Sequence, residues 1–457
     1  MHAKKISLLE TSIVLAVIIL SISLSVIVLK VTPSIAILFS ISLTMLYAWM
    51  RRFPLALLNK GIISGIQPGI VPIFIFILVG SLIAVWIKAG IIPTLMVVGF
   101  KIISIKFFVP SIFVVCAVVG SAVGSAFTVM STIGIAFFGI GTTLGLDPAL
   151  VVGSIVSGAI FGDKMSPLSE STNLTAAVVE ADLFKHIKNL MWSTVPAFIC
   201  SLILFCILGW NNHSASLKQI RNVVSVLEEN FSISFWAVIP ILFMFICAWK
   251  KIPAVFTILL NICISVGMIF IQNPHTSFKS LGTIIESGFV SHTGNKQLDL
   301  LLSRGGIESM MPTVALIILT LSLGGLLMET GLIETAMNAI AHKLVSTSSL
   351  ISATLLASIG TNIFVGEQFL SVILPGNAFK SVYKKKQLDP VVLGRALEDG
   401  GTVINYLIPW GVAGSFVAGT FGVPTLTYLP FVFFSLFSPL FSFLSALTGI
   451  GIKYTKK

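Results

Sequence analysis

The sequence predicts an all-α polytopic membrane protein with about 10 to 13 transmembrane helices, inverted-topology repeats, re-entrant hairpins and broken helices. Of its 457 residues, 56% are hydrophobic and only 10% are charged, against roughly 25% charged in ordinary soluble domains. A soluble globule could not cover its surface with so few polar groups. Long apolar runs and an internal repeat lead to the same fold class.

Continuous apolar runs recur along the chain, and most approach the ~20 residues that a membrane-spanning helix needs. A membrane β-barrel would instead alternate polar and apolar residues with a period of two. The runs therefore predict helices. The first run is too long for the ~7–15-residue apolar region of a secretory signal, and we expect it to be the first membrane helix. The runs are Ile13–Leu29, Ser34–Met50, Ile70–Ile87, Val195–Leu208, Ile233–Ala248, Val255–Ile271 and Thr425–Leu447.

The basic residues are placed as a membrane protein places them. A formal net charge of +11 would favour a nucleic-acid partner in a soluble protein. Here, however, lysine and arginine gather at the ends of apolar runs, as at Arg51–Arg52 and Lys384–Lys386. Such residues hold loops on the cytoplasmic side of a membrane. We therefore expect the lipid bilayer as partner and no nucleic acid.

Motifs of soluble catalysis are missing from the sequence. The five cysteines and six histidines show no spacing typical of a metal or redox centre. Neither a nucleophile elbow nor a phosphate-binding loop occurs. The sequence therefore predicts neither an enzyme nor a bound cofactor.

An internal repeat relates the two halves of the chain. Asp147–Pro148 and Asp389–Pro390 lie 242 positions apart (389 − 147). Both pairs are expected to be structural, because Asp favours the N-cap and Pro the first position of a helix. A shift of one residue extends the repeat back to Gly90 and Gly331. The offset of 242 also pairs Gly124 with Gly366, Phe127 with Phe369, Gly134 with Gly376, Gly158 with Gly400, and Pro167 with Pro409.

Charge indicates that the two copies enter the membrane in opposite directions. Phe138–Gly145 carries no basic residue, whereas its counterpart Lys380–Gln387 carries four lysines. Conversely, Asp182–Leu190 contains two lysines and its counterpart Pro424–Val432 is uncharged. Because basic loops face the cytoplasm, equivalent loops face opposite sides. This pattern predicts an inverted repeat of the kind secondary transporters use, the alternative being chance loop composition in a basic protein.

The repeat divides the chain into four predicted parts. Residues 1–60 form N-terminal membrane helices, 61–210 the first inverted repeat, 211–311 a linker with two membrane helices, and 312–457 the second repeat. Within the linker, Asn211–Asn230 is expected to be a polar loop with one amphipathic turn at most. Pro274–Met311 is expected to be an extramembrane or interfacial connection.

A first break in a membrane helix is predicted within Gly158–Asn173. Gly162 and Pro167 make a continuous helix unfavourable there, and irregular backbone at membrane depth survives only inside protein or beside a watery cavity. The alternative is an ordinary loop between helices. The break offers hard oxygen donors, which suit a small hard cation. They are Asp163, Ser166, Ser169, Thr172 and Asn173.

A second break is predicted within Ala396–Trp410. Glu398, Thr402 and Asn405 have the spacing of one helical face, and acids inside membrane helices are functional candidates because they are costly there. The alternative for Glu398 and Asp399 is pairing with Arg395. A third polar patch, Gly360–Gln368, predicts the start of a re-entrant hairpin and adds Glu367 to the candidates.

These stretches resemble the NhaC-type sodium/proton antiporter family of the ion-transporter superfamily. Glu170 and Glu367 stand where that family more often has Asp. The resemblance implies inverted repeats, re-entrant hairpins and a homodimer, and some relatives exchange small carboxylates or amino acids. The matching stretches are Phe161–Leu174, Asp182–Ile187, Thr361–Asn362, Gly366–Gln368, Leu397–Gly400, Leu407–Trp410 and Gly422–Thr425.

The resulting hypothesis is a multi-pass antiporter of the bacterial cytoplasmic membrane that binds sodium ions and protons in turn. Asp163 and Asn173 are the expected sodium ligands, and Glu367, Glu398 and Asp399 are further proton carriers. Lys164 either neutralises the empty site or extends to the membrane interface. The rival hypothesis is a sodium- or proton-coupled exchanger or symporter of small carboxylates, such as malate or lactate, or of amino acids.

Overall fold

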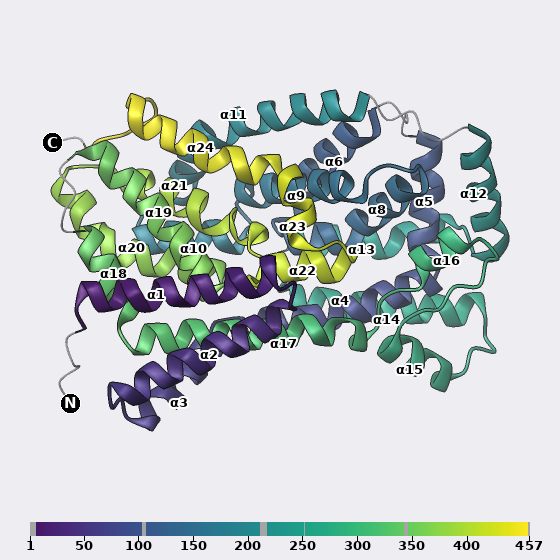
Figure 1. Cartoon of the computed structure of the whole chain (residues 1–457). Helices are drawn as coiled ribbons and strands as arrows, with labels where there is room; N and C mark the ends of the chain where they lie inside the picture. The colour runs from purple at the N-terminus through teal and green to yellow at the C-terminus, as the bar shows by residue number, and fades with distance from the viewer. Residues whose placement is uncertain (1–5, 103–106, 211–216, 251, 342–345, 456–457) are drawn as a thin grey trace.

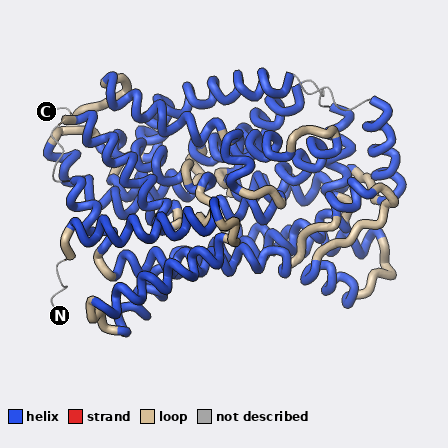
Figure 2. Tube along the Cα trace, in the orientation of Figure 1, coloured by secondary structure: helices blue, strands red, loops and turns tan. Residues whose placement is uncertain are grey.

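The computed structural model describes residues 6–102, 107–210, 217–250, 252–341 and 346–455. These residues form helices and loops, with a single isolated β-bridge between Leu388 and Tyr454 (Figure 2). Most of the long helices run along one common direction (Figure 1). In that view α11 (Leu183–Trp210) and α24 (Phe433–Thr448) lie at the top, and α3 (Leu55–Ile66) lies at the bottom.

The remaining helices follow in chain order. The first half contains α1 (Leu8–Ser23), α2 (Pro33–Met50), α4 (Ile70–Lys88), α5 (Ile91–Ile102), α6 (Phe108–Val123), α7 (Ala126–Val129), α8 (Ile135–Thr143), α9 (Pro148–Met165), α10 (Glu170–Val179) and α12 (Leu217–Asn230). The second half contains α13 (Val238–Trp249), α14 (Ala254–Gln272), α15 (Phe278–Ser287), α16 (Lys296–Leu302), α17 (Ile307–Glu329), α18 (Leu332–Ala341), α19 (Thr347–Val365), α20 (Gln368–Lys385), α21 (Pro390–Leu397), α22 (Val412–Phe421) and α23 (Thr425–Tyr428).

Ten helices in the described residues are long and apolar enough to cross a membrane, or up to twelve if each of two sharply bent pairs counts as one span. Many of their side chains are exposed apolar groups, such as Leu20, Trp49 and Ile63. Such surfaces suit contact with lipid. The predicted all-α polytopic fold class is confirmed.

The two hairpins of the predicted repeat have matching tips. Helix α6 ends at Gly124 and α19 ends at Gly366, with φ angles of +72° and +73° that favour glycine. The next residue caps the following helix in both copies. Ser125 Oγ accepts from Thr128 N at 3.3 Å, and Glu367 Oε2 accepts from Leu370 N at 2.8 Å. The two copies therefore have the same backbone conformation and the same kind of helix cap at their hairpin tips.

Packing inside each copy follows the same offset. A Cβ atom added to Gly158 would meet Phe113 O of α6, and one added to Gly400 would meet Leu355 O of α19. Both Asp–Pro pairs begin helices as expected, with Asp147 capping α9 and Asp389 capping α21. The opposite insertion of the copies and the boundaries of the four parts stay predictions.

Three local predictions are wrong. Of the expected polar loop Asn211–Asn230, residues 211–216 lie outside the described residues and the rest is helix α12, which packs against α5 and buries Val223 and Leu227. The run Thr425–Leu447 is not one helix, because it bends by 59° between residues 431 and 433. Gly162 does not interrupt α9, which continues to Met165.

The connection at 274–311 is partly helical, and the Asp299 side chain stabilises it through hydrogen bonds. It contains α15 and α16, and its last residues already belong to α17. Asp299 accepts hydrogen bonds from Thr293 N at 2.7 Å and from Ser291 Oγ at 2.9 Å. The pKa of Asp299 is lowered below its ordinary value, chiefly because the backbone amide of Thr293 donates to the carboxylate.

Candidate functional site: a carboxylate-lined cavity and a buried ion-pair network

A cavity of about 650 Å³ opens beside the first helix break, and α4, α13, α14 and the tips of both hairpins also line it. Three carboxylates line it: Asp163 at the end of α9, Glu170 at the start of α10, and Glu367 at the tip between α19 and α20. Apolar walls include Phe127 and Phe369, which are equivalent residues of the two copies. Among the described residues, no lysine, arginine or histidine lines this cavity. The cavity is therefore acidic, a character that favours cations.

Close helix packing places Asp163 at the cavity. Gly162 lies against α6, where an added Cβ atom would come within 2.5 Å of Ala117 O and of Gly120 Cα. No real Cβ atom fits at that distance, so glycine is required at this crossing. The contact sets α9 directly against the hairpin whose tip is Gly124. Asp163 follows at the next position, where it is partly exposed to the cavity.

The helix interruption predicted within Gly158–Asn173 begins after Met165. Its position at membrane depth stays a prediction. Ser166 has an extended backbone and its amide donates to Asp163 O at 3.1 Å. Ser169 then caps α10 by accepting from Thr172 N at 3.4 Å. A Cβ atom on Gly124 would lie 2.9 Å from Ser166 Oγ. The break therefore touches the hairpin tip of the same repeat.

Most of the predicted neutral ligands at this break form hydrogen bonds with backbone groups instead of facing the cavity. Ser166 Oγ accepts from Leu168 N at 3.2 Å, and Thr172 Oγ1 donates to Lys164 O at 3.3 Å. All three hydroxyl residues are fully buried: Ser166, Ser169 and Thr172. None of them is among the described residues that line the cavity. Asn173 does line it, and its amide donates to Pro167 O and Ser169 O.

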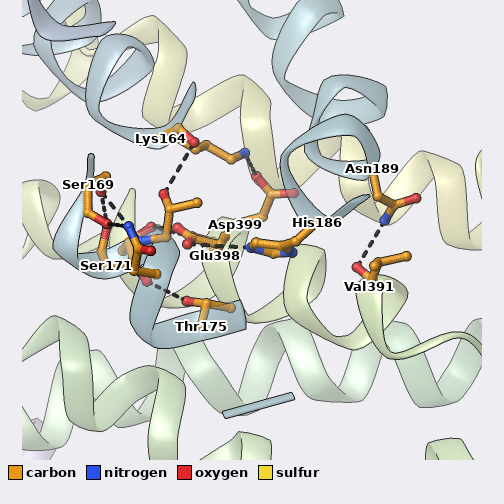
Figure 3. A network of polar contacts seen from close by, with 12 residues as sticks. Lys164, Ser169, Ser171, Thr175, His186, Asn189, Val391, Glu398 and Asp399 are labelled. Carbon is orange, nitrogen blue, oxygen red and sulfur yellow. Dashed lines mark hydrogen bonds and ion pairs between the residues drawn. The ribbon is translucent and has the colours of Figure 1, made fainter. Parts of the chain in front are cut away.

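The second predicted break contains a buried ion pair. Glu398 and Asp399 lie in a π-helical turn, Glu398–Thr402, and both are fully buried. Lys164 Nζ pairs with Asp399 Oδ1 at 2.5 Å (Figure 3). Ser438 on α24 bonds to both groups. The extension of Lys164 to the interface is therefore wrong, because its side chain is only 1% exposed.

The alternative interpretation, in which Arg395 pairs with these acids, is wrong. Its guanidinium donates to Ser445 Oγ at 2.6 Å and to Gly451 O at 3.3 Å. Glu398 instead accepts from Thr402 Oγ1 at 2.5 Å through Oε2. Its Oε1 lies 3.8 Å from Nε2 of His186, a residue at the start of α11 (Figure 3).

Asn405 connects the second break to the second hairpin. Its amide donates to Asn362 Oδ1 at 2.8 Å and to Gly366 O at 3.1 Å, and its Oδ1 accepts from Ala413 N at 2.8 Å. The predicted helical face of Glu398, Thr402 and Asn405 is interrupted, because Asn405 begins a separate 3-10 turn, Asn405–Leu407. Glu398 and Thr402, which lie one turn apart, still form a hydrogen bond.

The structure thus sorts the candidates into three groups, the first being Ser166, Ser169 and Thr172, which are buried at the first break. Asp163, Asn173 and Glu367 lie at the cavity, whereas the residues of the second break lie in the buried network. Sequence reasoning missed His186 and Ser438. His186 lies more than 200 residues from Glu398 in the chain, and Ser438 lies about 40 residues from Asp399. Residue spacing alone does not reveal such contacts. A signal for His186 was its place within the motif Asp182–Ile187.

Comparisons with known proteins identify the family of the chain. The model of the Na+/H+ antiporter family matches residues 158–450, which include both breaks and the second hairpin. The Na+/H+ antiporter NhaC of Alkalihalophilus pseudofirmus is 42% identical over 395 residues, which is 86% of each chain. NhaC of Bacillus subtilis is 36% identical over 86% of this chain and 87% of its own.

A malate-2H+/Na+-lactate antiporter of Bacillus subtilis is 32% identical over 87% of this chain and 86% of its own. Among solved structures, Neisseria gonorrhoeae MtrF, described as one of a class of antimetabolite efflux pumps, is 15% identical with a TM-score of 0.37 over 84% of each chain. The family match spans most of the chain, and the NhaC relatives match almost end to end. The chain belongs to the Na+/H+ antiporter family.

Proposed function

We propose that this chain exchanges sodium ions for protons by alternating access, with Asp163 as the residue that binds each in turn. The observation that carries the proposal is the position of Asp163. It lies at a helix break, beside a cavity that holds two further carboxylates and, among the described residues, no basic side chain. Membership of the antiporter family and the two NhaC relatives support the same activity.

Competition between sodium and a proton follows from the surroundings of Asp163. Its sequence neighbour Lys164 is engaged with Asp399 in the core and does not line the cavity. A carboxylate that is partly removed from water needs a positive partner, and either a proton or sodium meets that need. Asn173 uses its amide N–H groups on two carbonyls, so its side-chain oxygen is the atom that remains for a cation.

The cellular setting follows from the same observations. The chain is a multi-pass membrane protein, and the two NhaC relatives are bacterial, which places it in the bacterial cytoplasmic membrane. An ion gradient supplies the driving force for exchange, so the proposal includes neither an enzymatic reaction nor a bound cofactor. A homodimer stays a prediction.

Sodium-driven proton movement in proteoliposomes tests the proposal. With a pH dye inside the vesicles, wild-type protein should move protons when sodium is added, and Asp163→Asn should abolish this response. Asp182→Asn is the matched control, because Asp182 is an exposed helix cap and Asn caps equally well. Full activity of Asp163→Asn would refute the assignment.

A second candidate function is exchange of a small organic substrate. The cavity volume of about 650 Å³ exceeds what one ion requires and lies in the range of small-molecule sites. One relative is a malate-2H+/Na+-lactate antiporter. The acidic lining opposes a carboxylate substrate, because like charges repel. Uptake of radiolabelled malate, lactate or an amino acid by the same vesicles would favour this second function.

A further inference from the structure

A histidine and a glutamate face each other in the protein core, away from the cavity. His186 and Glu398 are both 0% exposed, and Nε2 lies 3.8 Å from Oε1. Within the described residues, neither ring nitrogen of His186 nor Oε1 of Glu398 has a hydrogen-bond partner. A buried polar atom without a hydrogen-bond partner is unfavourable, because it has lost its bonds to water. Two facing atoms without partners, Nε2 and Oε1, indicate that something small is bound between them in another state.

The charges around this pair identify a proton as the missing occupant. Lys164 is a fixed cation whose charge acts on Glu398, but it is already paired with Asp399. Arg395 on α21 donates to Ser445 and Gly451, and Tyr383 on α20 donates to Thr354. An ionised Glu398 beside a neutral His186 is therefore a buried charge without a dedicated partner, which is costly. One proton removes the net charge of the pair, and a closer approach of the two side chains from 3.8 Å then lets the facing atoms share it in a hydrogen bond.

The pair is separate from Asp163 but linked to it through charge. Neither His186 nor Glu398 lines the cavity. Asp163 and Glu398 repel each other when both are ionised. The chain also joins them, because Lys164 follows Asp163 and pairs with Asp399, which follows Glu398. A negative charge on Asp163 therefore favours a proton on the pair, and sodium at Asp163 removes that effect.

We propose that His186 and Glu398 share one proton and form a second proton site of the exchange cycle. The inference rests on the function proposed above. When sodium binds and neutralises Asp163, the proton of the pair leaves to water and Glu398 keeps the negative charge. His186 lies three residues into α11, about 4.5 Å along the helix axis from its first residue, so the pair is near the loop that precedes this helix.

Proton release on sodium binding tests this inference with the full chain in detergent. Sodium chloride is added to weakly buffered protein, and a pH dye counts the protons released at each starting pH. With two sites, release by wild-type protein should follow two separate steps against pH. His186→Gln and Glu398→Gln should each leave a single step, whereas the exposed control His292→Gln should keep both.

Each outcome decides the proposal. A single step in wild-type protein overturns it, even if both variants fail to fold. Two steps that persist in folded His186→Gln or Glu398→Gln also overturn it, because the second proton then resides elsewhere. If wild-type vesicles show no sodium-driven proton movement at all, the proposed function fails, and that result is distinct from a one-step release profile in an active exchanger.

Discussion

At the residue scale, Asp163 and Lys164 are neighbours in sequence that face different environments. Successive residues of an α-helix point about 100° apart. Asp163 therefore reaches the cavity, while Lys164 enters the core and pairs with Asp399. The base does not neutralise the acid beside it. This arrangement leaves the negative charge of Asp163 for a transported ion and reserves Lys164 for a structural pair between the two repeats.

Removing Lys164 should destabilise the protein severely. Lys164→Met leaves the Asp399 carboxylate buried without its partner, which costs about 3–5 kcal/mol. The double variant Lys164→Met/Asp399→Leu removes both charges and should recover most of that loss. Thermal unfolding in detergent measures the two variants. Equal stability of Lys164→Met and wild-type protein would show that the pair is not maintained.

Glu367 has two roles that one substitution separates. Its Oε2 caps α20, and its side chain lines the cavity while only 1% exposed. Glu367→Gln keeps an oxygen for the cap but removes a negative charge. We expect unchanged thermal stability and a KM for sodium raised by roughly tenfold, equivalent to about 1.4 kcal/mol of lost attraction. An unchanged KM would remove Glu367 from the cation path.

At the element scale, the site depends on interrupted helices packed at very short distances. α9 stops at Met165 and α21 gives way to the π-helical turn at Glu398. Each interruption lies against the hairpin of its own repeat, through Gly124 in the first copy and Asn405 in the second. These contacts fix the polar groups at the level of the hairpin tips.

Gly162→Ala should separate α9 from α6. The added methyl group would overlap backbone atoms of Ala117 and Gly120, and such overpacking costs about 1–3 kcal/mol. We expect a lower unfolding temperature and loss of sodium-driven proton exchange. Gly267→Ala is the matched control, because no atom lies within 4 Å of its added Cβ. Wild-type exchange by Gly162→Ala would show that this crossing does not position Asp163.

The elements that sequence alone predicted are those with local signals. Apolar runs predicted the long helices, and Asp147–Pro148 predicted the start of α9 through capping chemistry. The bend between α23 and α24 escaped prediction, because the apolar character of Thr425–Leu447 continues through it. Glycine inside an apolar run predicts a helix break, but Gly162 lies inside the continuous helix α9, where the absence of a side chain permits close packing against α6.

At the scale of the whole molecule, the repeat brings distant segments into one site. Sequence reasoning found the acids because acids are rare in membrane helices. It did not find their partners, since His186, Ser438 and Lys164 meet Glu398 and Asp399 only after the two copies pack together. The division between an accessible cavity and a closed network is likewise a property of the assembled fold.

The central claim is that Asp163 binds the sodium ion in the acidic cavity. Equilibrium binding of radioactive sodium to purified protein at alkaline pH measures this directly, without any transport step. Wild-type protein and Asp182→Asn should bind sodium with equal affinity, and Asp163→Asn should show no saturable binding because it lacks the charge. Saturable sodium binding of wild-type affinity by folded Asp163→Asn would contradict the account.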